Sequence, residues 1–69
     1  MVGKRRVIKP ILGVVMYTSI AITVPAGEVL DILVAPPEGD RTIDVMWKGQ
    51  ALMMFVADVK ARSRPVGEQ

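Results

Sequence analysis

The sequence predicts a small all-β domain. Residues 18–24 and 41–47 alternate apolar and polar side chains with a period of two, as strands with one buried face do. Turn-forming residues separate the apolar stretches, at 25–27, 35–40 and 48–49. The chain has no cysteine and no histidine. Apolar packing must therefore stabilise the fold without disulfides or a zinc site.

Two strands are predicted in the N-terminal third. Residues 7–16 are rich in β-branched side chains, but Pro10 cannot donate to a neighbouring strand and Gly13 weakens pairing. We therefore expect an edge strand or a bent one. Residues 18–24 form the second strand, and one of its faces comprises Thr18, Ile20, Ile22 and Val24.

After a turn at Pro25-Ala26-Gly27, residues 28–34 are predicted to form a third strand. Its apolar face comprises Leu30, Ile32 and Val34. Residues 35–40 contain two prolines and a Gly-Asp pair, so we expect the most exposed loop there.

The best-defined element is a hairpin over residues 41–55 with a two-residue turn at Lys48-Gly49. The predicted register pairs Trp47 with Gln50, Val45 with Leu52 and Ile43 with Met54, which gathers apolar residues on one face. The other face carries Asp44, Met46, Met53 and Phe55. It is too apolar to remain freely exposed.

Residues 56–62 are predicted to form a short helical or 3₁₀ turn, because Val56 and Val59 are three positions apart. Pro65 and Val66 then extend beside the N-terminal strand. We expect one domain over residues 1–69, with loose ends at 1–6 and 66–69.

Five strands, a proline-rich connection, a tight hairpin and a late helical turn resemble a small five-stranded SH3-like barrel. The resemblance is architectural and covers about half of the chain. It is closest in the hairpin over residues 41–55 and in the short turn at Ala57-Asp58-Val59. An SH3 peptide groove needs a cluster of aromatic side chains, whereas this chain has Tyr17, Trp47 and Phe55 alone. The resemblance therefore implies no proline-peptide binding. A β-sandwich assembled from two chains is the alternative architecture.

Enzymatic activity is not predicted. Without histidine and cysteine the usual bases, nucleophiles and metal ligands are missing, and no cofactor motif is present. Asp31 and Asp44 are interpreted as outward-facing strand residues, and Asp58 as a helix-capping carboxylate. The remaining catalytic alternative is a site formed between subunits, for which the sequence offers no residue constellation.

The sequence predicts a binding or adaptor domain that self-associates. Its apolar fraction of 51% is high for a small domain, which has little interior in which to bury side chains. We expect part of this surface to contact a second copy. The predicted interface residues are Met46, Trp47, Met53 and Phe55.

Nucleic-acid binding is the alternative function. Positive charge is concentrated at both ends of the chain, and these ends meet in space if the first and last strands pair. The candidate contacts are Lys4, Arg5, Arg6, Lys9, Lys60, Arg62 and Arg64.

Residues 1–26 resemble a secretory signal, with a basic stretch, an uncharged run over 11–24 and a small residue at Ala26. We interpret the run as buried strands instead, because cleavage would leave too short a chain to build a core. The run is also shorter than the ~20 residues of a membrane-spanning helix. On these grounds we expect a cytoplasmic protein without a membrane partner.

Overall fold

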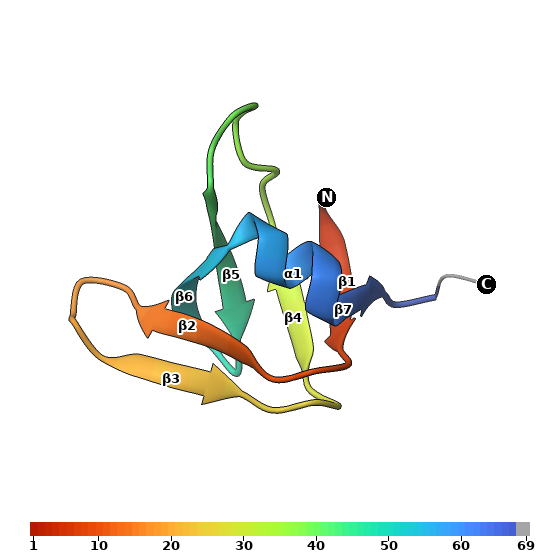
Figure 1. Ribbon diagram of the computed structural model, residues 1–69, viewed down its shortest axis with the longest axis horizontal. Coiled ribbons are helices and arrows are strands. Elements are labelled where there is room, and N and C mark those ends of the chain that lie inside the picture. Colours follow the sequence, from red (N-terminus) through yellow and green to blue (C-terminus); the bar gives the residue numbers. More distant parts are fainter. Residues whose placement is uncertain (68–69) are drawn as a thin grey trace.

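Seven strands form one antiparallel sheet in the computed structural model, which describes residues 1–67 (Figure 1). The sheet is curled into an open half-barrel, and a short helix is the only helical element in the described part of the chain. The all-β prediction is therefore confirmed. The elements are β1 (Gly3–Val7), β2 (Ile11–Val15), β3 (Ala21–Val24), β4 (Val29–Ile32), β5 (Thr42–Trp47), β6 (Gln50–Phe55), α1 (Val56–Arg62) and β7 (Ser63–Pro65).

The predicted five-stranded SH3-like barrel is not found: the sheet has seven strands and is an open half-barrel. The strand expected over residues 7–16 is divided at Ile8-Lys9-Pro10 into β1 and β2. The amides of Ile8 and Lys9 both donate to the carbonyl of Arg62, at 2.8 and 3.2 Å, so the bend is fixed by the end of α1. β7 supplies the other additional strand. The strand order is β3-β2-β6-β5-β4-β1-β7, which leaves β3 and β7 as the two edges.

Residues 1–6, predicted as a loose end, instead contribute most of β1. This strand pairs with β4 on one side, where Gly3 lies opposite Ile32, and with β7 on the other. It is therefore bent away from β2 but is not an edge strand. Beyond β7, Val66 still donates its amide to the carbonyl of Lys4 at 2.9 Å. Residues 68–69 of the predicted C-terminal loose end lie outside the described residues.

The central hairpin has the predicted register. Trp47 lies opposite Gln50, Val45 opposite Leu52 and Ile43 opposite Met54. Lys48 and Gly49 adopt positive φ angles of 50° and 75° at the turn. A two-residue turn of this kind matches the twist of the strands it joins.

Two predicted strands are shorter in the structure. β4 ends at Ile32, so Val34 leaves the sheet and is 75% exposed, although Leu30 and Ile32 are buried as expected. β3 begins at Ala21, and Ile20 is 59% exposed in the preceding turn. At Val34 the alternation continues beyond the paired part of β4. At Ile20 the carbonyl still accepts from the amide of Val15, but the side chain already lies outside the core.

The core fills the concave side of the curled sheet, and α1 closes it. The helix contacts β2, β6 and β7, which confirms the predicted helical turn after the hairpin (Figure 1). Val59 is fully buried in the core, and Val56 packs against its margin. Ser63 follows the helix and is also fully buried; its hydroxyl donates to the carbonyl of Val59 and accepts from Nε of Arg5 at 2.8 Å.

Within residues 1–67, no helix combines the length and the apolar character that crossing a membrane would require.

Candidate functional site

An apolar patch lies on the convex face of the sheet, opposite the core. It consists of Leu12, Val14, Met53 and Phe55, and we call it the outer patch. Val14 lies opposite Met53 across β2 and β6, and Phe55 and Leu12 continue the same face. Leu12 is 51%, Met53 38% and Phe55 54% exposed. Uncovered apolar side chains side by side on a sheet are typical of a contact surface.

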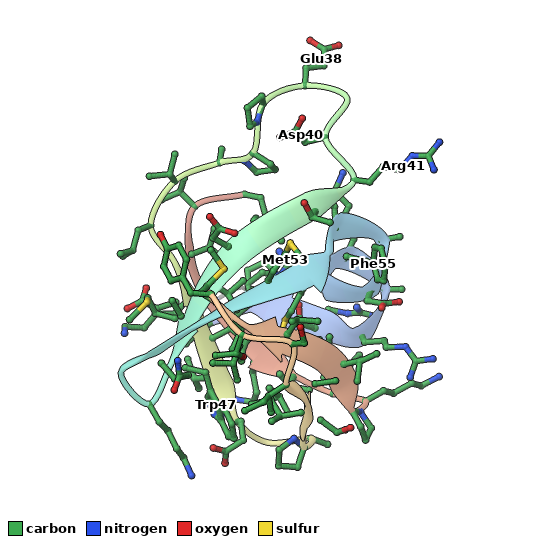
Figure 2. All side chains as sticks on the ribbon, turned by 90° about the vertical axis from the view of Figure 1, so that its left-hand side faces the viewer. Glu38, Asp40, Arg41, Trp47, Met53 and Phe55 are labelled. Carbon is green, nitrogen blue, oxygen red and sulfur yellow. The ribbon has the colours of Figure 1, made fainter. Side chains whose placement is uncertain are left out.

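Three of the four predicted interface residues share this face. Met46 lies opposite Ala51, and Met53 opposite Asp44, so both point the same way as Phe55. Trp47 instead lies on the core face, and Figure 2 shows it at the far end of the hairpin from Phe55. Met46, Met53 and Phe55 therefore lie on the same face of the sheet, and Trp47 lies on the other.

The outer patch extends toward an edge strand that carries no charge. The amide of Val15 donates to the carbonyl of Ile20 at 2.8 Å. This bond shows which backbone groups of β3 point toward β2. Because backbone groups alternate in direction along a strand, those of Ala21 and Thr23 point away from β2. β3 therefore presents an open and uncharged backbone edge beside Leu12.

Trp47 is held by a carboxylate. Its indole Nε1 donates to Oε1 of Glu28 at 2.9 Å, and Nζ of Lys48 lies 3.3 Å from the same oxygen. The Lys48 ammonium also lies 5.1 Å from the centroid of the Trp47 ring. The hydrogen bond from Trp47, followed by that from Lys48, lowers the pKa of Glu28 against the opposing effect of burial. These contacts give Trp47 a structural role at the margin of the core.

The pairing of β1 with β7 brings basic residues from both ends of the chain together. Arg6 lies directly opposite Arg64. Lys4 lies on the same face of β1 and forms an ion pair with Asp31 at 3.2 Å. Arg5 points to the opposite face, where its Nε and Nη2 donate to Ser63 at 2.8 and 3.0 Å. Lys4, Arg6 and Arg64 therefore form a basic edge on the convex face.

The other candidate basic residues are dispersed. Arg62 donates to the carbonyl of Pro10 at 3.2 Å, near Lys9 in the bend between β1 and β2. Lys60 lines a separate hollow beside Phe55 and Asp58. Within residues 1–67, Lys4 alone of the seven predicted contacts forms an ion pair with a carboxylate.

A groove that the sequence did not predict opens between β4 and β5. It has a volume of about 420 Å³ and is lined by the departing segment from Leu33 to Pro37 and by β5. Asp31, Asp40 and Asp44 contribute carboxylates to its wall. Figure 2 shows Asp40 in the long loop above the hairpin, with Glu38 at the tip.

The groove exists because β4 and β5 separate early. They pair at a single position, where Asp31 lies opposite Met46. On its other side β5 is paired with β6 along its whole length, from Thr42 to Trp47. The proline-rich composition of residues 35–40 was a signal for the loop, but the separation of the strands depends on tertiary pairing.

The three carboxylates of the groove do not form a metal site. Among residues 1–67 there is no group of three acidic, histidine or cysteine side chains that could hold a metal ion.

Comparison of the chain with protein-family models, curated proteins and solved structures gave no match. The class of the protein therefore rests on its fold, an all-β protein with one curled open sheet.

Proposed function

We propose that this protein is a non-catalytic binding module that self-associates through the outer patch. The observation that supports the proposal is the exposure of Leu12, Met53 and Phe55 on adjoining strands of an otherwise well-packed sheet. Covering such side chains contributes roughly 25 cal/mol for each Å² of apolar area removed from water. Flexible methionine side chains adapt readily to a contacting surface.

A second copy is the partner best suited to this face. The four residues of the outer patch carry no charge, so two copies of it meet without opposing like charges. The open edge of β3 adjoins the patch, and an uncharged edge strand is a template for pairing with another chain. A two-fold arrangement uses the same surface on both copies.

Sedimentation equilibrium over a range of protein concentrations tests self-association. We expect a reversible dimer that Phe55→Ser and Leu12→Ser each shift toward monomer by at least about tenfold in dissociation constant. Val2→Ser is the matched control, because Val2 is 65% exposed and lies outside the patch. A wild-type protein that remains monomeric at millimolar concentration would overturn the proposal, as would an equal effect of the control.

Polyanion binding, nucleic acid above all, is the second proposal, and it rests on the basic edge. Like charges directly opposite each other in an antiparallel pair are destabilising, yet Arg6 faces Arg64. A bound phosphate backbone would offset that repulsion. Lys4 extends the same surface by one further cation.

Filter binding of single- and double-stranded oligonucleotides at two salt concentrations tests this second proposal. We expect affinity that falls steeply as salt rises, and a further loss in an Arg6→Gln, Arg64→Gln variant. Arg41→Gln serves as control, since Arg41 is exposed and directly precedes β5, which β4 separates from β1 and β7. Absence of binding at low salt would eliminate the proposal.

A further inference from the structure

We propose that the groove between β4 and β5 binds an extended basic peptide segment of a partner protein by strand addition to β5. The proposal does not rest on self-association, because the groove and the outer patch are lined by different residues. Three features support it: an open backbone edge, an apolar wall that does not pair with that edge within residues 1–67, and carboxylates without an ion-pair partner.

The open edge belongs to β5 and follows from which of its backbone groups bond to β6. The amide of Val56 donates to the carbonyl of Arg41 at 2.8 Å, so the backbone of Arg41 faces the β6 side. Backbone groups alternate in direction along a strand, so those of Thr42 and Asp44 point away from β6. Within residues 1–67 neither amide has a backbone or side-chain partner on that side. The backbone amides and carbonyls of Thr42 and Asp44 therefore face the groove, two residues apart, as an added strand requires.

The opposite wall of the groove does not bond to the backbone groups of Thr42 and Asp44. The segment from Leu33 to Pro37 is apolar, and Pro36 and Pro37 have no backbone amide to donate. Leu33 and Val34 are 66% and 75% exposed, so their side chains are available to a ligand. An added strand would bury part of this surface while it satisfies the backbone of Thr42 and Asp44.

Charge selects the class of peptide. Asp31 is already paired with Lys4 at 3.2 Å, but within residues 1–67 neither Asp40 nor Asp44 lies within ion-pair distance of a cation. Asp44 projects from the convex face of β5, so a lysine or arginine opposite it in an added strand forms a cross-strand pair. Alternate residues of the peptide then point to the concave face, where Ile43 and Val45 of β5 line the groove. The recognised segment therefore alternates basic and apolar residues.

Fluorescence polarisation with a labelled, capped peptide of alternating valine and lysine tests the proposal on the full chain. We expect saturable binding that weakens about three- to fivefold for each of Asp40→Asn and Asp44→Asn. Asp58→Asn is the matched control, because Asp58 lines the other hollow, beside Lys60. The same peptide with glutamate in place of lysine should not bind.

Main-chain recognition has its own test. N-methylation of the peptide residue that faces β5 removes a backbone donor, and we expect about fivefold weaker binding for each hydrogen bond lost. In amide NMR spectra of the unmodified complex, Thr42 and Asp44 should show the largest shifts and slowed hydrogen exchange. Equal binding of the methylated peptide, an equal effect of Asp58→Asn, or shifts centred elsewhere would overturn the proposal. Sedimentation of the same variants reports self-association separately.

Discussion

Arg6 lies directly opposite Arg64 where β1 pairs with β7. Opposed like charges cost stability in an antiparallel pair, and Arg64→Glu replaces the repulsion with an attraction. We expect the free energy of unfolding to rise by about 0.5 kcal/mol, measured by urea denaturation at low salt. Arg64→Gln should give a smaller gain, and a fall in stability with glutamate would contradict the prediction.

The Trp47–Glu28 hydrogen bond predicts a pH dependence of stability. Because the pKa of Glu28 is lowered in the folded protein, the unfolded chain binds more protons at acidic pH. The contribution is complete above the ordinary glutamate pKa of about 4.3 and is lost as the pH falls through the lowered value. Trp47→Phe removes the donor, so its urea midpoint should vary less with pH in this window than the wild-type midpoint.

Unfolding of Trp47→Phe should be followed by circular dichroism, because this variant has no tryptophan whose fluorescence could report unfolding. Glu28→Gln should flatten the same pH profile without any change at position 47. Identical acid profiles for the wild type and Trp47→Phe would show that the hydrogen bond does not control the titration of Glu28.

Val59 anchors α1 in the core, and its side chain is fully buried. Val59→Ala removes two methyl groups and leaves a small cavity, so we expect a loss of about 2 kcal/mol in the free energy of unfolding. Val34→Ala is the same chemical change at a position that is 75% exposed, and it should stay within about 0.5 kcal/mol of wild type. Similar losses for both variants would contradict the assignment of Val59 to the core.

Gly13 faces the core with little room for a side chain. A Cβ atom there would lie 3.3 Å from Cε of Met54 and 3.4 Å from Cδ1 of Leu52. The flexible Met54 side chain can accommodate a methyl group, so Gly13→Ala should change stability by less than about 1 kcal/mol. Gly13→Val adds two further methyl groups and should cost about 1–3 kcal/mol. Thermal unfolding of the two variants side by side distinguishes this size dependence from a general intolerance of substitution.

The candidate sites were predictable to different degrees. Alternation along residues 41–55 was enough to put Met46, Met53 and Phe55 on one face, because register in a tight hairpin follows from the turn. The meeting of Arg6 and Arg64 was expected only conditionally, since it required the two ends of the chain to pair. The groove was not foreseen, because it depends on where β4 stops pairing with β5.

By itself, the sequence determined the elements whose structure depends on residues close together in the chain. The turn at Lys48-Gly49, the register beside it and the helical turn around Val59 depend on neighbours a few positions apart, and all three were predicted. Binary patterning also determined the all-β class, since a period of two is incompatible with a helical stripe.

Tertiary structure alone decided the number of strands, the closure of the sheet and the extent of each strand. Gly3–Val7 is a strand because β4 and β7 satisfy its backbone from both sides, and Val34 is exposed because no strand continues beside it. Pairing between distant segments depends on the free energy of the whole sheet, and local alternation does not encode where such pairing begins or ends.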